Sequence, residues 1–186
     1  MIRDFFSQQR GNAVLEFALL LPILIGVILV SADLYNINRI RGVFEQSSHN
    51  FASILANQSE LNVKSFDLLV ESVFPVTSLG DYSLIVSKVN LDRSMDWKPI
   101  YRGELEGICP EYSEGDRYVG EMPEEDKEES DVSFIVVQLC RTTQGLTMNS
   151  GLLGDKLIES VAMNRMSTHT VKLDERLSAE VGVDYD

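Results

Sequence analysis

The side chains in this sequence that are best suited to covalent chemistry are two cysteines, Cys109 and Cys140. They do not form a C-x-x-C pair, and the two histidines, His49 and His169, have no companions at a spacing that suits a metal site. In a domain that is exported from the cytoplasm, two such cysteines are expected to form one disulfide bond; two buried thiols are the alternative. Closing a loop of this length stabilises a fold by about 3–4 kcal/mol in the chain-entropy treatment.

Signatures of catalytic and nucleotide-binding sites are absent from the sequence. It contains no P-loop, no G-x-S-x-G, no H-E-x-x-H and no G-x-G-x-x-G. Pairs of Asp and Glu are frequent, but an acidic chain produces such pairs by chance. We therefore expect no catalytic residue, no cofactor, no metal ion and no small-molecule substrate, and a periplasmic enzyme is the least favoured function.

Negative charge is concentrated after residue 42. The chain has a formal net charge of −13. Its first 42 residues carry four arginines against three carboxylates, a net of +1, so the remaining residues carry −14. Such a domain repels phosphate backbones and anionic lipid surfaces, so we expect no binding to nucleic acid. A helix, rather than electrostatic attraction, is expected to hold this domain at a membrane.

An acidic loop occupies residues 111–131. It contains ten carboxylates against one arginine and one lysine. A cation site or a contact with a basic partner would be the functional interpretation of this loop. The chain has no D-x-[DN]-x-[DN]-G calcium loop, however. Like charges in such a segment repel one another, and we favour a solvated loop.

The segment with the clearest physical role is a long apolar run near the N-terminus. Residues 17–30 carry no charge, and residues 13–32 carry one, Glu16. Twenty helical residues just span a bilayer core of about 30 Å. Three interpretations remain open: a secretory signal cut after Ala32, an uncut single-span anchor, and a cut after Gly11 that leaves the apolar helix on the mature protein.

Glu16 distinguishes these interpretations. A carboxylate in the middle of a membrane helix costs about 2.5–3.5 kcal/mol, and less near an interface. Neither a signal peptide nor a simple anchor has a use for it. After a cut behind Gly11, Asn12 becomes the first residue and Glu16 the fifth, so that the carboxylate could pair with the free α-amine of a neighbouring subunit. The alternative is that Glu16 lies at the level of the lipid headgroups and is merely tolerated.

Residues 10–17, RGNAVLEF, and the apolar run that contains Pro22 resemble the class III signal sequence of type IV pilins and pseudopilins. More narrowly, EFALLLP is similar to the start of the TadE/TadF group of tight-adherence minor pilins. The resemblance covers residues 8–35. The length of the chain and its C-terminal cysteine pair favour the TadF branch. Asn12 differs from the Phe that many type IVa pilins have at the first mature position, so N-methylation of this residue is not carried over, whereas the cut is.

This resemblance implies a function and a location. In the family a prepilin peptidase cuts the leader, here between Gly11 and Asn12, and Glu16 and Phe17 then take part in subunit assembly. The implied protein is a minor pilin or pseudopilin of a tight-adherence, Flp-type pilus, with other pilin subunits and the peptidase as partners. It would span the bacterial inner membrane once, with its C-terminal domain periplasmic, and could enter the extracellular pilus. The alternative is a single-pass or secreted acidic binding module that is not part of a pilus.

The helix that carries these residues is expected to extend beyond the membrane. Between residues 33 and 58, apolar residues recur at spacings of three and four. This period predicts an amphipathic helix that continues the membrane helix into the domain. Pro22 and Gly42 are the positions where the helix is expected to weaken or bend.

The rest of the domain is predicted to contain one more helix and several strands. The helix covers residues 65–74, with Asn62 or Ser65 as its cap and Pro75 ending it. The period of residues 157–166 fits a strand or a short helix, and we expect a strand. Together the predicted strands cover residues 82–90, 97–102, 131–141 and 157–166.

The predicted fold class is therefore α+β, with a long N-terminal helix and a small antiparallel-sheet domain of pilin-like organisation. The helix is expected to lie against one face of the sheet. The expected divisions of the chain are a leader (1–11), a transmembrane helix (12–32), its amphipathic continuation (33–58), a periplasmic domain (59–173) and a loose C-terminal tail (174–186).

Overall fold

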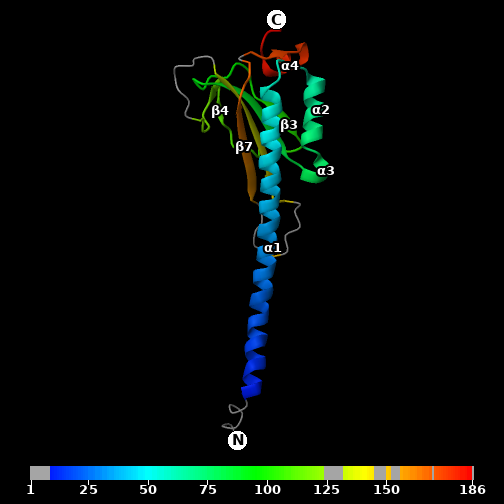
Figure 1. Cartoon of the computed structure of the whole chain (residues 1–186), viewed down its shortest axis with the longest axis vertical. Coiled ribbons are helices and arrows are strands. Elements are labelled where there is room, and N and C mark those ends of the chain that lie inside the picture. The colour runs from blue at the N-terminus through cyan, green and yellow to red at the C-terminus, as the bar shows by residue number, and fades with distance from the viewer. Residues whose placement is uncertain (1–8, 124–131, 145–149, 152–155, 169, 186) are drawn as a thin grey trace.

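A long helix projects from a small α+β head in the computed structural model of the chain (Figure 1). The structure describes residues 9–123, 132–144, 150–151, 156–168 and 170–185. The helix, α1, extends from Gln9 to Ala56 and passes through Pro22 and Gly42 without interruption. The apolar stretch and the amphipathic stretch of the sequence therefore form one element, as their periodicity predicts.

Four strands form an antiparallel sheet in the order β3-β2-β6-β7. The register places Val86 opposite Val137 and Val137 opposite Ala162, so that apolar residues of three strands form one row. Three of the four predicted strands are confirmed to within two residues at each end. The strands are β2 (Ser83–Asn90), β3 (Ile100–Gly103), β6 (Ser133–Thr142) and β7 (Leu157–Arg165).

The strand predicted over residues 97–102 begins three residues later than expected. Pro99 precedes β3 and has no backbone N–H to contribute to a sheet. The N–H of Lys98 donates instead to the carbonyl of Val181, at 3.1 Å. This hydrogen bond ties the segment before β3 to the end of the chain rather than to β2.

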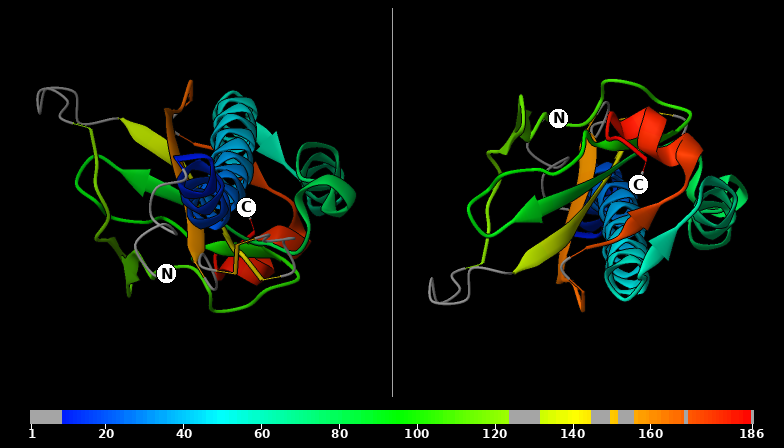
Figure 2. Two further views of the ribbon diagram at one scale, coloured as in Figure 1. Left: turned by 90° about the horizontal axis from the view of Figure 1, so that it is seen from below. Right: turned by 90° about the horizontal axis from the view of Figure 1, so that it is seen from above.

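One face of the sheet is covered by the second half of α1, which packs on β6 and β7 (Figure 2). Phe44 and Phe51 of α1 are fully buried there. The ring of Phe51 lies 5.0 Å from the ring of Phe74, measured between centroids. Ser48 lies between Phe44 and Phe51 along α1. Its hydroxyl is hydrogen-bonded to that of Ser160 in β7 at 2.7 Å, and both side chains are buried. The core between helix and sheet is thus mainly apolar, and it includes the polar pair of Ser48 and Ser160.

The predicted second helix is confirmed, with an earlier start. Helix α2 spans Val63–Val73, and the side chain of Asn62 accepts a hydrogen bond from the N–H of Ser65 at 2.8 Å. An N-cap of this kind satisfies one of the free backbone donors of the first turn. A further short helix, α3 (Val76–Leu79), follows Pro75 and was not predicted.

The prediction of a loose C-terminal tail over residues 174–186 is wrong for most of this segment. Residues Glu175–Val181 form a helix, α4. Asp174 caps it by accepting a hydrogen bond from the N–H of Leu177 at 2.8 Å, and Gly182 ends it with a φ of 77°. Leu177 and Val181 are buried in the main core, so burial of these apolar side chains holds the helix in place.

Arg102 connects this helix to two other elements. Its guanidinium donates to Asp67 of α2 at 2.8 Å and to both carboxylate oxygens of Glu180 in α4, at 2.5 and 3.1 Å. The guanidinium carbon also lies 5.3 Å from the centroid of the Phe66 ring. Hydrogen bonds to Glu180 and Asp67 raise the pKa of Arg102 above its ordinary value. Both lateral helices are thus held against the edge strand β3.

Smaller strand pairs complete the head. β1 (Glu60–Leu61) pairs in parallel with β8 (Lys172–Leu173). Within the acidic loop, β4 (Ser113–Glu114) and β5 (Arg117–Tyr118) form a short hairpin on the side of the head away from α2 (Figure 2). Residues 124–131 of that loop lie outside the described residues. The hairpin brings Tyr118 onto a second, smaller cluster of buried residues with Val89, Met95 and Val136.

Candidate functional site

The first half of α1 is apolar and uncovered. Every side chain from Val14 to Leu29 is exposed, including Phe17, whose exposed fraction is 61%. Removing a large apolar side chain from water is worth about 1.5–3 kcal/mol. A helix that exposes so many of them is not at its free-energy minimum in water, and it requires an apolar environment.

The length of this segment matches a bilayer. Residues 14–32 extend for about 28 Å at the helical rise, close to the thickness of a bilayer core of about 30 Å. Within the described residues, one helix is long and apolar enough to cross a membrane, and its most apolar window is not buried in the head at all. The apolar helix is thus available for insertion and could serve as a membrane anchor. A helix in the core of a soluble protein passes the same test of length and composition, but it would be covered.

The residues assigned to processing and assembly lie at the free end of this helix. Gly11 and Asn12 are helical in backbone conformation. Glu16 and Phe17 follow and are exposed. Asn12 and Glu16 are four residues apart in the sequence, which is about one turn of the helix. Among the described residues, no cation forms an ion pair with Glu16; its carboxylate faces outward from a single chain.

A buried carboxylate marks the point where the helix enters the head. Asp33 is fully buried and accepts two hydrogen bonds from Ser150, one from the backbone N–H at 2.8 Å and one from the hydroxyl at 2.5 Å. The two residues are distant in the sequence, and Ser150, which lies between β6 and β7 along the chain, reaches the helix here. Asp33 is one of the three carboxylates of the first 42 residues, and its burial could not be predicted because its partner is set by tertiary structure and no local pattern signals it.

Polar and aromatic side chains gather just beyond the apolar segment. Tyr35 is 69% exposed, and Arg39 and Arg41 are exposed one and two turns later. Tyrosine is enriched at the level of lipid headgroups, and arginine side chains extend toward phosphate while their stems stay in apolar surroundings. This order along α1 is the order expected of a helix that leaves a membrane and enters water.

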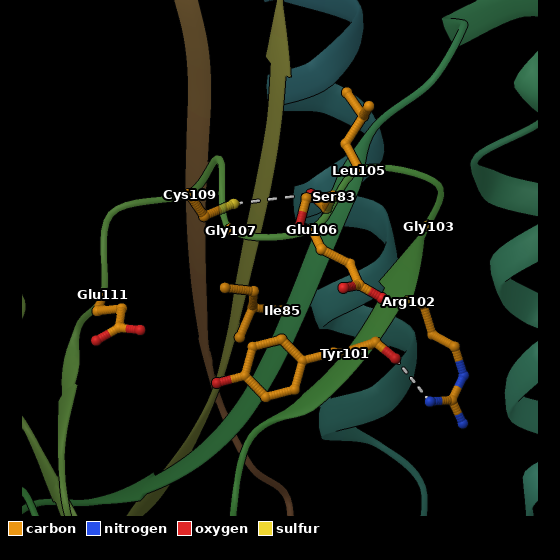
Figure 3. A pocket seen from close by; sticks show the side chains of 10 residues that line it. All are labelled: Ser83, Ile85, Tyr101, Arg102, Gly103, Leu105, Glu106, Gly107, Cys109 and Glu111. Atoms are coloured by element: carbon orange, nitrogen blue, oxygen red, sulfur yellow. Dashed lines mark hydrogen bonds between the residues drawn. The ribbon is translucent and has the colours of Figure 1, made fainter.

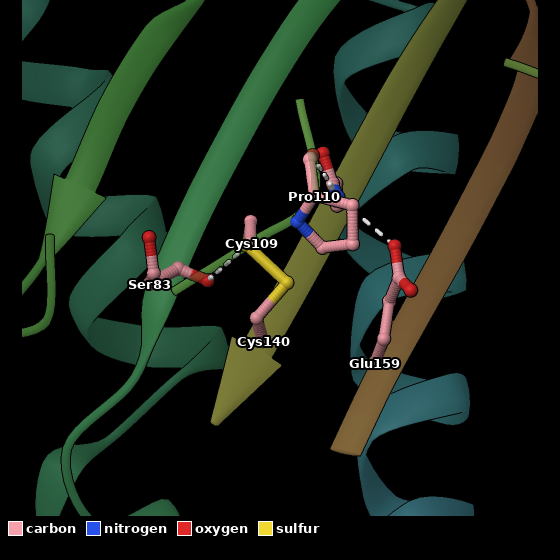
Figure 4. Close-up of a disulfide and its surroundings, with 6 residues drawn as sticks. Ser83, Cys109, Pro110, Cys140 and Glu159 are labelled. Carbon is pink, nitrogen blue, oxygen red and sulfur yellow. Dashed lines mark hydrogen bonds between the residues drawn. A yellow bond between two sulfur atoms is a disulfide. The ribbon is translucent and has the colours of Figure 1, made fainter. Parts of the chain in front are cut away.

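The head contains the disulfide bond that the sequence predicts. Cys109 is bonded to Cys140, which lies in β6 and is fully buried (Figure 4). Next to it, the side-chain amide of Gln138 donates to the carbonyl of Pro110 and to the carboxylate of Glu159, each at 2.9 Å. The disulfide bond holds Cys109, and the hydrogen bond from Gln138 holds the adjacent Pro110. Both residues of the loop after β3 are therefore fixed to β6 on the outer face of the sheet.

Two tyrosines pack on another part of that outer face. The rings of Tyr112 and Tyr118 meet edge to face, with centroids 6.1 Å apart. Burial raises the pKa of Tyr118 to about 12. Burial also raises the pKa of Tyr112, and the carboxylate of Glu159 adds to the shift. Both phenols are neutral at physiological pH and act here as packing groups.

Metal-ligating side chains are not gathered in the described part of the chain. No three His, Cys, Asp or Glu residues lie close enough there to hold an ion. Glu111, Glu114 and Asp116 of the acidic loop are exposed. His49 is exposed on α1, and His169 lies outside the described residues.

Comparison of the chain with protein-family models, with curated proteins and with solved structures found no match. The similarity of residues 8–35 to the signal sequences of tight-adherence pilins therefore stays a prediction. What bears on function is the geometry of α1 and the chemistry of the head.

Proposed function

We propose that this protein is a minor pilin or pseudopilin that takes part in assembly of a tight-adherence pilus. One observation carries the proposal: an apolar segment about one bilayer thick is exposed over its length and continues, as the same helix, into the core of the head. Such a helix can lie in a membrane and later pack against like helices, because both surroundings are apolar. The chemistry of the protein is then association rather than turnover.

The proposed topology places the head outside the cytoplasm. A disulfide bond is stable in an oxidising compartment, and the bond between Cys109 and Cys140 suits the periplasm. Tyr35, Arg39 and Arg41 would lie at the outer surface of the inner membrane, and the leader would lie on the cytoplasmic side. The strongly acidic head is repelled by anionic lipids, so it stands away from the membrane surface on α1.

Processing is proposed to create the group that Glu16 needs. A cut after Gly11 leaves Asn12 with a free α-amine, which is positively charged at neutral pH. In an apolar bundle of helices, the Glu16 carboxylate of one subunit would pair with that amine on a neighbour. Pairing removes the cost of leaving a lone carboxylate in apolar surroundings, and it sets the axial offset between neighbouring helices.

Mass spectrometry of the mature protein purified from membranes tests the cut directly. We expect an N-terminus at Asn12. An intact Met1, or a start at Asp33, would contradict the proposal, since the first retains the leader and the second removes the helix. A Gly11→Ala variant should accumulate with its leader attached.

The role of Glu16 requires a separate experiment. Glu16→Ala should be cut normally, because the change lies beyond the scissile bond, and should then be missing from sheared pilus fractions. Glu16→Asp, which keeps the charge on a shorter side chain, is the matched control and should be incorporated in part. Normal incorporation of Glu16→Ala would remove the role assigned to this carboxylate.

A single-pass binding module outside the pilus is the second candidate. The presence of a cavity on the outer face of the head, described below, favours it. Fractionation separates the two functions: a pilin is found in sheared pili as well as in membranes, whereas an anchored binding module stays in the membrane fraction.

A further inference from the structure

The face of the sheet that is turned away from α1 is only partly covered. Tyr112 and Tyr118 pack over its middle, but the part over β2 and β3 is open. There the segment that follows β3 borders a cavity of about 630 Å³ that is open to solvent (Figure 3). Cavities of this size accommodate a small molecule or one to two side chains of a partner.

The wall of this cavity is held in place by three features of the fold. Gly103 has a φ of 103°, and a Cβ there would lie 2.2 Å from the carbonyl oxygen of Tyr82, so only glycine allows the chain to leave β3 at this angle. At the other end of the segment, Cys109 is bonded to Cys140. Gln138 holds the carbonyl of Pro110 next to it. Because both ends of the wall are fixed, the cavity exists before anything binds.

The lining combines an apolar base with negative charge. Ile85 and Tyr101 are partners across β2 and β3, and their side chains lie side by side in Figure 3; Tyr101 is 57% exposed. Glu106 and Glu111 line the same cavity and are exposed. Leu105 adds a further apolar side chain.

Arg102 also lines the cavity but does not neutralise the glutamates. Its side chain extends away from the other lining side chains in Figure 3. The guanidinium is engaged by the carboxylates of Asp67 and Glu180. The lining of the cavity therefore carries two carboxylates, which lie on opposite sides of Ile85 and Tyr101 in Figure 3, and it presents an aromatic face on which a cation can rest.

We propose that this cavity binds a lysine or arginine side chain, with a neighbouring apolar residue, from the surface of a partner protein. The cation would lie between Glu106 and Glu111 and over the ring of Tyr101, and the apolar residue would contact Ile85. An anionic ligand would be repelled by the two glutamates. A second copy of this head is disfavoured because each copy carries −14 after residue 42.

This inference goes beyond the proposed role in pilus assembly and does not depend on it. Helix packing in the bundle uses the first half of α1, whereas the cavity lies in the head on the face opposite the second half. It assigns the head a basic partner and the place where that partner docks.

Binding can be measured by fluorescence anisotropy with the full chain in nonionic micelles at about 150 mM salt, which screens distant charges. The probes are three dye-labelled peptides with the sequence Gly-Ser-X-Phe-Ser-Gly, in which X is arginine, norleucine or glutamate. We expect saturable binding of the arginine peptide, at least fivefold weaker binding of the norleucine peptide and no binding of the glutamate peptide.

Variants locate the site. Because both glutamates are exposed, the double change Glu106→Gln with Glu111→Gln should leave the fold intact and weaken binding of the arginine peptide by roughly fivefold to twentyfold. The matched control, Glu45→Gln with Glu71→Gln, removes the same charge from exposed positions outside the cavity and should change affinity less than twofold. Tyr101→Ala should weaken binding as well.

Four results would overturn the inference. They are equal binding of the arginine and norleucine peptides, unchanged affinity in the cavity variant, an equal loss in the control variant, and no binding at millimolar peptide. None of them bears on the mature N-terminus or on pilus incorporation, so the inference can fail while the proposed function stands.

Discussion

The two halves of α1 share one backbone but lie in different surroundings. From Val14 to Leu29, apolar side chains point in every direction and none is covered. From Asp33 onward, apolar and polar residues alternate around the helix, and Phe44, Phe51 and Leu55 are buried on one side. A helix that is apolar all round requires an apolar environment, and one with an apolar stripe lies on a protein core.

The boundary between the uncovered apolar segment and the head is therefore set by where the side chains of α1 point, and not by a break in the backbone. The helix passes from one environment to the other within a few residues, at Ala32 and Asp33. There a carboxylate becomes fully buried by bonding to Ser150 of the head.

Truncating one large apolar side chain in each half should give the largest contrast. Phe51→Ala is expected to destabilise the head by about 3–5 kcal/mol, because Phe51 is fully buried and contacts the ring of Phe74. Leu24→Ala, at a side chain exposed in the first half, should leave the stability of the head unchanged. Denaturant unfolding of the full chain in micelles, followed by the fluorescence of Trp97, measures both. Equal losses would contradict the division of α1.

Introducing a charge should affect the first half of α1 and not the second, and the quantity that changes is membrane insertion. Leu24→Lys places a cation at the middle of the proposed membrane segment and should disfavour insertion by about 3 kcal/mol. Val43→Lys adds the same charge at a partly exposed position beside the head and should leave insertion unchanged. Carbonate extraction of membranes reports the inserted fraction. Full retention of Leu24→Lys would argue against a membrane location of this segment.

Removing a hydroxyl should have a smaller effect. Ser48→Ala leaves the buried hydroxyl of Ser160 without its partner and should cost the head about 1–2 kcal/mol. Ser31→Ala removes an exposed hydroxyl that donates to the carbonyl of Val27 and should cost less than about 0.5 kcal/mol. Unfolding of Ser48→Ala with Ser160→Ala tests the pairing, since removing both hydroxyls should recover part of the loss.

The smallest expected effect is a loss of stability of the head near pH 10, which arises from Tyr118. The pKa of Tyr118 is raised to about 12 in the folded protein. The unfolded chain releases this proton near pH 10, before the folded one does, so stability is complete below pH 10 and is lost as the pH rises toward 12. Tyr118→Phe should reduce this loss by roughly a few tenths of a kcal/mol at pH 10. An unchanged pH profile would show that burial of the phenol is not coupled to folding.

Elements set by local signals were predictable from the sequence. Helix α2 starts at the Asn62 cap and ends before Pro75, and both residues act through their immediate neighbours. The alternation in β6 placed Ile135, Val137 and Leu139 on one face, and these three residues lie in the main core. The continuity of α1 also followed from the spacing of its apolar residues.

Two kinds of feature were missed. Helix α4 was not predicted, although Asp174, Gly182 and the apolar pair Leu177 and Val181 are ordinary local signals of a short helix. Burial of Asp33 and the cavity beside Tyr101 depend on where residues far away in the sequence fold back. No periodicity or motif in the sequence predicts such long-range contacts.

The continuity of α1 from its apolar first half into the head has a mechanical consequence. A pull on the head along the axis of α1 is carried as shear across the surface that the helix shares with β6 and β7. Many side-chain contacts and the bond between Ser48 and Ser160 resist that force together. The protein therefore extends little under such a force. At high force we expect α1 to be pulled out of the core of the head, because no flexible linker is present in α1 to stretch first.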